Sequence, residues 1–371
     1  MTPESPLRAV LSAIVEPQLV RTLGELRFLG DVDEVNESPH IELVLPVTNW
    51  PNLALLVAAI ETVVPGAVVT VRSMDENELL GLRNFLRGEM AANPGPGQHD
   101  HGSDPKPRFL DKLSKTRILG ISSGKGGVGK SSVTVNLAIA LALSGYDVGV
   151  LDADVYGFSL PKMLGAVNDP IVLGDTVIPT LAHGVRCVSM GYFVPDEQPV
   201  IWRGPMLHKA IEQLVTEAWW DEPDFLLIDM PPGTGDVALT LSEVLPRIEM
   251  YVVTTPQAAA QRVAQRSAYA ARKLKLSVRG VIENMSWFTG DDAKRYEIFG
   301  AGGGARLAQE LGIALLAQIP LESKLREGGD VGEPIVVSDP ESEAAMAFVA
   351  LAATVAAQGP ARVYRQELKL L

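Results

Sequence analysis

The sequence predicts an α/β protein in two parts, a small α+β domain followed by a larger domain built on a parallel sheet. From residue 109 onward, short apolar runs alternate with longer helical patterns, which is typical of βαβ units. A glycine-rich turn follows the first of these runs directly. The chain of 371 residues is also longer than a domain with one ordinary hydrophobic core, so its length favours roughly two domains of 100–250 residues.

The first 90 residues have the pattern of the small α+β domain. Ser5 before Pro6 is typical of an N-cap with proline at the first helical position, and predicts a helix to about Val15. The next predicted elements are a strand, a helix and a second strand, at 40–47, 53–63 and 66–73. A final helical stretch, "ELLGLRNFLRG", ends this unit.

A linker is predicted at residues 91–108, "AANPGPGQHDHGSDPKPR", which are rich in proline, glycine and polar residues and have no apolar period. His99 and His101 would suit a metal ion, but solvated histidines are ordinary in such a stretch. We therefore expect a small domain, a linker, a large domain and a C-terminal tail, at 1–90, 91–108, 109–359 and 360–371.

The larger domain is predicted to hold a parallel sheet covered by helices on both faces. One helix should run from Lys130 to Ser144 and end at Gly145, and the last should follow Asp339–Pro340 and stop at Gly359. The predicted strands lie in "RILGIS", "DVGVLDAD", "FLLIDMPP", "MYVVTTP" and "VRGVIENM".

Composition narrows the classes of function. The chain carries 32 Lys and Arg against 45 Asp and Glu, a net charge of −13, which disfavours a nucleic-acid footprint and an anionic membrane surface. The N-terminus lacks the basic start of a signal peptide, and no apolar run approaches the ~18 residues of a membrane span, so we expect a cytoplasmic protein. A single cysteine, Cys187, excludes an intramolecular disulfide framework.

Residues 124–131, "GKGGVGKS", fit the phosphate-loop spacing G-x-x-x-x-G-K-S/T between a predicted strand and a predicted helix. Backbone N–H groups and the helix N-terminus would hold phosphates, Lys130 would reach the β- and γ-phosphates, and Ser131 would ligate Mg²⁺. The alternative is a glycine-rich turn that only joins strand to helix. The expected nucleotide-binding residues here are Gly124, Lys125, Gly126, Gly127, Val128, Gly129, Lys130, Ser131 and Ser132.

Acidic residues follow two of the predicted strands. Asp229, in "FLLIDMPPGTGD", should lie at the carboxyl edge of the sheet and hold Mg²⁺ through its water shell, the alternative being a helix cap. Asp152 and Asp154 end another strand, and we expect Asp154 to position the attacking water unless both aspartates cap the next segment. Residues 233–235 have the composition of a switch that senses the γ-phosphate.

With Lys125 and Lys130 in one turn, the motif resembles the deviant Walker A motif of the MinD/ParA/nitrogenase-reductase class of dimeric ATPases. The resemblance implies a homodimer in which Lys125 reaches the nucleotide of the partner subunit. It also implies ATP hydrolysis with Lys125, Lys130 and Asp154 as the catalytic residues.

Within that class the chain resembles the Mrp/ApbC iron–sulfur cluster carriers, over about residues 110–350. The resemblance implies transfer of clusters to apoproteins, and that Asn284 reads the adenine edge, the alternative being a strand-end cap. Residues 11–26 also resemble the small cluster-assembly domain that is fused to many Mrp proteins. The stretches that carry the main resemblance are "GKGGVGKSSVTVNLA", "LDADVYGFSLPKMLG", "WRGPM", "DMPPGTGD", "VVTTPQ", "GVIENMS", "IFGAGGG" and "PESEA".

The chain departs from the family pattern at the cluster ligands. The family's C-x-x-C lies where this chain has "WFTGDDAKRY" (287–296), and the small domain's usual cysteine is replaced by Trp50. A 4Fe–4S cluster takes four thiolates, and a dimer of this chain offers two, both Cys187. Cys187 is therefore either a cluster ligand or a buried inert thiol. Asp291 and Asp292 would be poorer cluster ligands than thiolates, and a solvated loop is expected there.

Two functions follow from these patterns. The first is ATP-driven iron–sulfur cluster assembly, with a different cluster mode or a cysteine-bearing scaffold as partner. The second is a cluster-free MinD/ParA-like dimer switch that binds a protein or membrane, for which the tail at 360–371 offers only a short amphipathic pattern. Nitrogenase-reductase-like electron transfer would need two cysteines per chain, and no lid or acceptor site indicates a small-molecule kinase.

Overall fold

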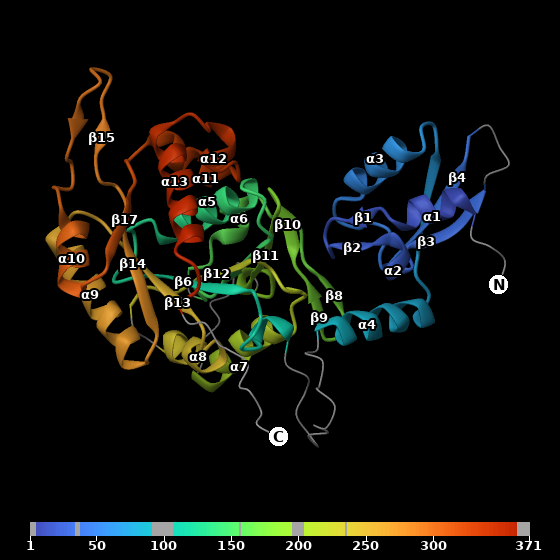
Figure 1. The fold of residues 1–371 in the computed structure, drawn as a ribbon, viewed down its shortest axis with the longest axis horizontal. Helices are drawn as coiled ribbons and strands as arrows, with labels where there is room; N and C mark the ends of the chain where they lie inside the picture. Colours follow the sequence, from blue (N-terminus) through green and yellow to red (C-terminus); the bar gives the residue numbers. More distant parts are fainter. Residues whose placement is uncertain are drawn as a thin grey trace, which may run out of the picture.

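The computed structural model describes residues 5–33, 38–90, 107–155, 157–194, 204–233 and 236–361. Figure 1 shows a large part built around a central sheet, with the N-terminal lobe packed beside it. The predicted linker lies almost wholly outside the described residues, so the division of the chain at 91–108 stays a prediction.

The central sheet has eight strands in the order β10-β11-β7-β12-β6-β13-β14-β17. All neighbouring pairs are parallel except β10 with β11. The five predicted strands are confirmed, whereas β10 and β17 were not predicted. The bounds are β6 Arg117–Ser123, β7 Val148–Asp152, β10 Thr180–Ala182, β11 Val185–Ser189, β12 Phe225–Asp229, β13 Glu249–Thr254, β14 Ser277–Glu283 and β17 Ala314–Gln318.

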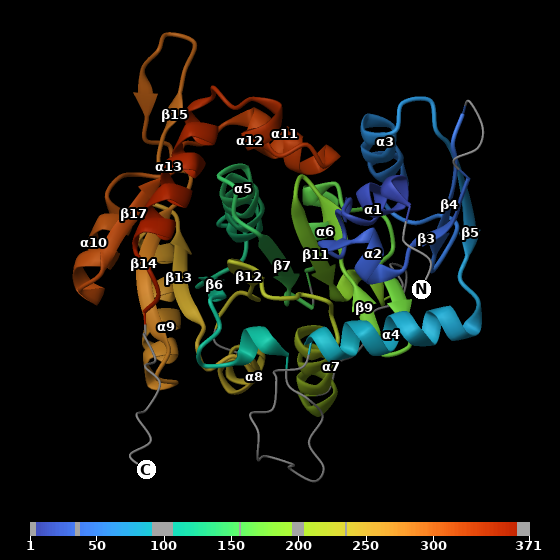
Figure 2. The same ribbon diagram turned by 45° about the vertical axis from the view of Figure 1, so that its right-hand side comes forward.

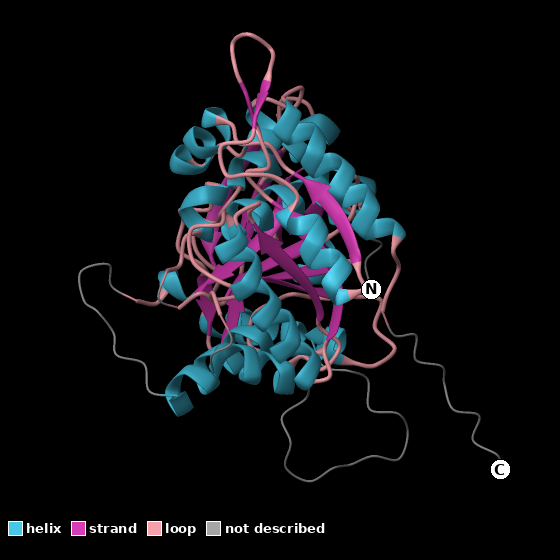
Figure 3. Cartoon of the chain, turned by 90° about the vertical axis from the view of Figure 1, so that its left-hand side faces the viewer, coloured by secondary structure: helices cyan, strands magenta, loops and turns pink. Residues whose placement is uncertain are grey.

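Helices cover both faces of this sheet, because its central strands are apolar on both sides (Figures 2 and 3). On β6, Leu119 joins the core under one layer and Ile118 the core under the other. The first layer contains α5 Lys130–Leu143, α6 Leu160–Leu164, α11 Ser323–Val331, α12 Ile335–Ser338 and α13 Glu343–Ala357. The second contains α7 Gly204–Thr216, α8 Asp236–Val244, α9 Ala258–Lys273 and α10 Gly303–Leu311.

The N-terminal lobe is α+β, as predicted, with a sheet in the order β3-β4-β5. Ser5 caps the first helix by accepting from Arg8 N, but the helix ends at Ser12 rather than Val15, because β1 begins there and pairs with β2. The elements are α1 Pro6–Ser12, β1 Val15–Glu16, β2 Arg21–Thr22, α2 Leu23–Leu26, β3 Leu29–Asp33, β4 His40–Leu45, α3 Leu53–Val63, β5 Val68–Ser73 and α4 Glu76–Met90.

The lobe packs on the hairpin of β8 Ile171–Leu173 and β9 Thr176–Ile178 (Figure 1). Trp219 is fully buried in the lobe's core and donates from Nε1 to Leu19 O at 3.1 Å. Arg21 forms a bidentate ion pair with Asp221, both N···O distances being 2.8 Å. These contacts join sequence positions about 200 apart, so the lobe is docked on the large part.

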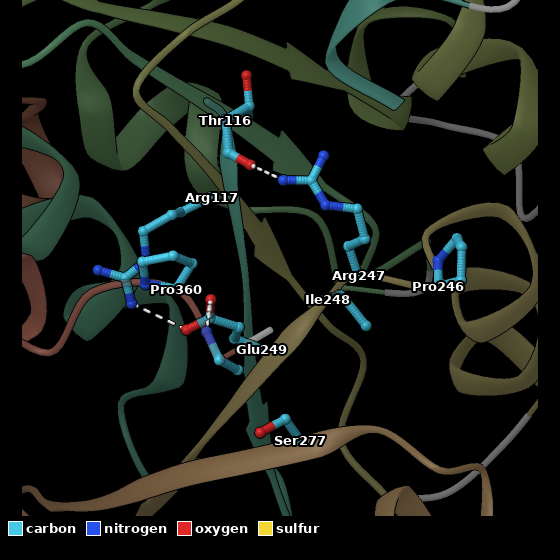
Figure 4. A pocket seen from close by; sticks show the side chains of 9 residues that line it. Thr116, Arg117, Pro246, Arg247, Ile248, Glu249, Ser277 and Pro360 are labelled. Atoms are coloured by element: carbon cyan, nitrogen blue, oxygen red, sulfur yellow. Dashed lines mark hydrogen bonds and ion pairs between the residues drawn. The ribbon is translucent and has the colours of Figure 1, made fainter. Parts of the chain in front are cut away.

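At the amino-terminal edge of the sheet, Arg117 and Glu249 form an ion pair beside a small cavity (Figure 4). Arg117 donates to Glu249 at 2.8 Å and to Val355 O at the end of α13. The cavity beside this pair holds about 20 Å³, far too little for a nucleotide. The helix α13 begins two residues later than predicted from the proline, because Ser342 accepts from Ala345 N as its N-cap.

No helix in the described ranges is long and apolar enough to cross a membrane. The tail beyond Ala361 lies outside them, so the structure does not test its amphipathic pattern.

Candidate nucleotide site

The glycine-rich loop connects β6 to α5 at the carboxyl edge of the sheet, where α/β folds bind ligands. Gly127 and Gly129 have φ of +77° and +79°, a left-handed backbone that favours glycine. A Cβ on Gly129 would lie 2.2 Å from Asn284 Nδ2, whereas Cβ atoms on Gly126 and Gly127 would meet nothing within 4 Å. The loop is therefore pressed against Asn284 on one side and open on the other.

Side chains of α5 converge on Asp229 at the end of β12. The Asp229 carboxylate is fully buried and accepts from Lys130 Nζ at 2.5 Å, Ser131 Oγ at 2.7 Å and Thr134 Oγ1 at 2.7 Å. These bonds come from side chains rather than from the backbone of a helix start, which disagrees with a helix-cap role. Thr134 is not among the site residues predicted from the sequence. Its position one helical turn after Lys130 would have indicated that it lies on the same face of the helix.

The two aspartates at the end of β7 have different surroundings. Asp152 accepts from the backbone N–H groups of Ser159 and Leu160 at 3.0 and 3.2 Å and so caps the start of α6. The Asp154 carboxylate instead lies 3.6 Å from Lys130 Nζ. Burial raises the pKa of both carboxyls, and the negative charge of Asp229 raises it further. The capping interpretation therefore fits Asp152, while Asp154 faces the phosphate loop.

Two adjoining cavities flank the loop and share Gly129 and Ser132 in their walls. One, of about 240 Å³, is lined by Lys125, Lys130 and Asp154, among others. The other, of about 230 Å³, is lined by Asn284, by Met163 of α6 and by both apolar and charged residues of α11, among them Leu325, Arg326 and Asp330. Together they fall in the range of roughly 300–1,000 Å³ that small-molecule sites occupy.

Asn284 follows β14 and is almost fully buried. Its Nδ2 donates to Val128 O at 2.9 Å, which leaves Oδ1 without a hydrogen-bond partner in the part of the chain that the structure describes. Because Asn284 lines this cavity, its unsatisfied oxygen is an acceptor that a ligand with a hydrogen-bond donor can use. The backbone N–H of Asn284 donates to Thr254 O, so its main chain continues the strand pairing.

Lys125 is half-buried and turned toward α9. Its Nζ donates to Gln257 Oε1 at 3.2 Å, and Gln257 is the N-cap residue of α9. No local sequence pattern indicates this contact of Gln257, because it joins residues 132 positions apart. Of the predicted switch, Gly233 donates from N to Ser123 O at 2.9 Å, while residues 234 and 235 lie outside the described residues.

Cys187 lines neither of the two cavities beside the loop. Cys187 is fully buried among apolar side chains of the core, and burial raises the pKa of its thiol. Such a placement fits an inert structural thiol and does not fit a cluster that bridges two chains.

Residues 287–296, where the resemblance implies a C-x-x-C, contain the hairpin of β15 Phe288–Thr289 and β16 Arg295–Tyr296, which projects from the molecule (Figure 1). Arg295 stacks on the Trp287 ring at 4.1 Å, and Asp291 and Asp292 are exposed. The described ranges contain no group of three or more His, Cys, Asp or Glu side chains suited to a metal ion. This hairpin therefore offers no cluster ligands.

The N-terminal lobe has no cysteine at the position where its resemblance to a cluster-assembly domain implies one. Trp50 is buried at that position, and its Nε1 donates to Glu16 Oε1 at 2.9 Å. The other oxygen of Glu16 accepts from Leu19 N at 2.6 Å, while burial raises the pKa of this carboxyl. The Trp50 indole and the Glu16 carboxylate therefore occupy the position where the resemblance implies a cysteine.

Comparison with known proteins places these features in a family. The model of the NUBPL iron-transfer P-loop NTPases, of the ParA group, matches residues 114–356. The chain belongs to this family. The resemblance to cluster-carrier ATPases is confirmed, and the family's P-loop NTPase character agrees with the open phosphate loop.

Curated relatives of the family cover nearly the whole chain. The iron–sulfur cluster carrier protein of Escherichia coli K12 is 47% identical over 365 residues, covering 96% of this chain and 93% of that protein. The protein of the same name from Mycobacterium tuberculosis H37Rv is 38% identical, covering 91% and 88%.

Solved structures share the fold of the family's P-loop part. A nucleotide-binding protein from Archaeoglobus fulgidus in complex with ADP has a TM-score of 0.54 at 32% identity, over 63% of this chain and 92% of that one. The cell division ATPase MinD of Pyrococcus furiosus has a TM-score of 0.51 at 27% identity, over 65% and 99%. The MinD/ParA-type α/β fold is thereby confirmed.

Proposed function

We propose that this protein is a Mg²⁺-dependent ATPase that works as a homodimer and delivers iron–sulfur clusters to apoproteins. The observation that carries the ATPase is the convergence of Lys130, Ser131 and Thr134 on Asp229 beside an open glycine loop. The curated relatives, named iron–sulfur cluster carrier proteins, support the delivery role.

The donor set fits a magnesium nucleotide. A hydroxyl and a carboxylate 2.7 Å apart, Ser131 Oγ and Asp229 Oδ2, can supply one direct and one water-mediated contact, as Mg²⁺ prefers. When bound, the metal neutralises charge on the transferred phosphoryl group. Nucleotide binding would draw Lys130 away from Asp229 toward the phosphates, and Asp154 would orient the attacking water.

The neighbouring cavity suits adenine. An acceptor at Asn284 Oδ1, fixed by the bond from Nδ2 to Val128 O, would receive the exocyclic amino group of adenine. Guanine presents a carbonyl oxygen at the same place and would meet the acceptor unfavourably. The site should therefore prefer ATP to GTP.

Lys125 supports the proposal of a homodimer. Among the residues that the structure describes, its amine makes one hydrogen bond, to a neutral amide, and is not tied to a carboxylate. A lysine held this weakly can leave Gln257 for the nucleotide of a second subunit. Hydrolysis would then release the two chains from each other.

The chain's own ligands do not fit a 4Fe–4S cluster, because its only cysteine is buried in the core. We infer that the cluster is held by thiolates of a cysteine-bearing scaffold or of the recipient. ATP binding and hydrolysis by this chain would then drive its transfer.

Two anaerobic experiments test these parts separately. After reconstitution with iron and sulfide, neither the parent nor Cys187→Ser should hold a stable cluster. The bound iron, the bound sulfide and the visible absorption spectrum measure this. A cluster that is present in the parent and lost in the variant would contradict the scaffold model.

In the second experiment, a cluster-loaded scaffold is mixed with an apo-dehydratase. Recovery of dehydratase activity should be faster with parent and MgATP than with Lys130→Ala, and equal rates would refute ATP-driven delivery.

A cluster-free dimer switch is the second candidate, and the burial of Cys187 favours it. Co-sedimentation with anionic liposomes, with and without ATP, identifies a membrane-binding switch. ATP-dependent dimerisation without accelerated cluster transfer identifies one that acts on proteins.

We further propose that residues 1–90 and 109–359 are separate domains of a cytoplasmic protein, and that the first is a cluster-assembly domain. The N-terminal lobe has a core of its own, extended by three side chains of the large part, Leu173, Ile178 and Trp219.

A further inference from the structure

The helix α9 presents a row of cations to solvent. Arg262, Arg266 and Lys273 are exposed, and Tyr269 between them is 44% exposed. At 100° per residue these four side chains fall within an arc of about 60°, along roughly 16 Å of helix. We call them the α9 basic face; the helix lies at the outer edge of the molecule beside α10 (Figures 1 and 2).

Nothing in the described part of the chain neutralises this face. The helix has four cations and no acidic residue among its 16 positions, although the chain holds 45 acids. Glu310 on the neighbouring α10 accepts from the amides of Gln261 and Gln265 and not from the cations. An ordinary solvated helix interleaves both signs of charge at i and i+4, and α9 does not.

We propose that the α9 basic face is a docking surface for an acidic segment of a partner protein. Three cations on one helix face, with an aromatic ring among them, match a helix or strand that carries a row of carboxylates. A nucleic acid fits less well, because its long phosphate backbone would extend beyond this narrow row onto a chain of net charge −13. This inference does not depend on the proposed cluster transfer.

The same helix supports the phosphate loop. A Cβ on Gly124 would lie 2.2 Å from Ala264 N, and Ser267 Oγ donates to Ser123 O at 3.4 Å. The N-cap residue of α9, Gln257, holds Lys125. A partner bound to the α9 basic face would therefore contact the element that backs the nucleotide site.

Fluorescence anisotropy with the full-length protein tests the proposal. The probe is a labelled 20-residue helical peptide with four glutamates spaced i, i+4 on one face. The triple variant Arg262→Glu, Arg266→Glu, Lys273→Glu should bind it about tenfold more weakly than the parent or worse, since three attractive contacts become repulsive. The matched control reverses three exposed lysines on other elements, Lys112, Lys209 and Lys294, and should bind like the parent.

Further measurements complete the test. Raising salt from 50 to 200 mM should weaken parent binding and barely affect the triple variant. The triple variant should keep the parental rate of basal ATP hydrolysis and the parental melting temperature. If charge reversal unfolds the chain, a triple alanine variant at the same positions replaces it, and its affinity for the peptide should be about threefold lower than that of the parent.

Three outcomes would overturn the proposal. Equal peptide binding by parent, triple variant and control would show nonspecific attraction. Tighter binding of a 20-base-pair DNA duplex, lost in the triple variant, would make the face a nucleic-acid site. Loss of ATP-dependent self-association in the triple variant would make it an interface between two copies of this chain.

Discussion

Replacing Lys130 with alanine should destabilise the protein before any nucleotide is added. Lys130 is only 7% exposed, and its Nζ lies 2.5 Å from Asp229 and 3.6 Å from Asp154. The substitution removes the cation from beside the carboxylates of Asp229 and Asp154. The buried carboxyl of Asp152, on the strand adjacent to Asp229, loses the same neighbouring charge. Breaking a buried pair in this way costs about 3–5 kcal/mol, which proton uptake reduces, so we expect a loss of about 3 kcal/mol.

Lys125→Ala is the matched control, since it removes the same side chain five residues earlier in the same loop. Lys125 is half-buried, and within the described ranges its amine donates one hydrogen bond, to Gln257. Its removal should cost no more than about 1 kcal/mol. The ordering of the two variants, rather than either value alone, tests this interpretation of the site.

The loss at Lys130 should also depend on pH. Burial raises the pKa of Asp152 and Asp154, and removing the cation raises it further. A carboxyl whose folded pKa lies above its unfolded value favours the folded state at low pH, and this contribution is lost as the pH rises through the folded pKa. Lys130→Ala should therefore be less stable relative to the parent at pH 8 than at pH 6.

Reversible urea unfolding of nucleotide-free protein in EDTA measures the free energies, and calorimetry measures ADP binding. Lys130→Ala should lose ADP binding, and Lys125→Ala should keep it but lose ATP-dependent dimerisation and turnover. Equal stability losses in the two variants would refute the buried ion pair. If Lys130→Ala bound ADP with parental affinity, the phosphate-binding role of Lys130 would be refuted. If Lys125→Ala dimerised as the parent does, the role of Lys125 across subunits would be refuted.

Three further predictions concern other parts of the molecule. Asn284→Ala should weaken ATP binding by up to about tenfold in calorimetry and GTP binding less; equal losses for both would contradict adenine reading. A double-mutant cycle on Arg21 and Asp221 should give a coupling of about 1 kcal/mol in unfolding, and additive losses would show the docking pair to be inert. Glu16→Gln should cost about 1–3 kcal/mol, because an amide N–H2 then faces a backbone N–H such as that of Leu19. Since burial raises the pKa of Glu16, the parent's advantage should shrink as the pH rises above 4.5, and a constant difference would contradict this.

Much of the nucleotide site was predictable because its parts follow local rules. The loop spacing and the apolar run before it place Lys130 and Ser131 at a helix start, and the run before Asp229 places that carboxylate at a strand end. Parallel pairing of β12 with β6 then brings them together. Helix ends were less predictable, as Ser342 shows, because several nearby residues compete to cap the same turn.

The sequence by itself determined the parallel sheet, the phosphate loop, the family and the absence of a C-x-x-C motif, because periodicity, motif spacing and residue identity are properties of the chain. Only the tertiary structure decided that Asp154 rather than Asp152 faces Lys130, that Cys187 is sealed in the core, and that Lys125 is held by Gln257. These depend on strand register and side-chain packing between residues far apart in the chain, which no local pattern encodes.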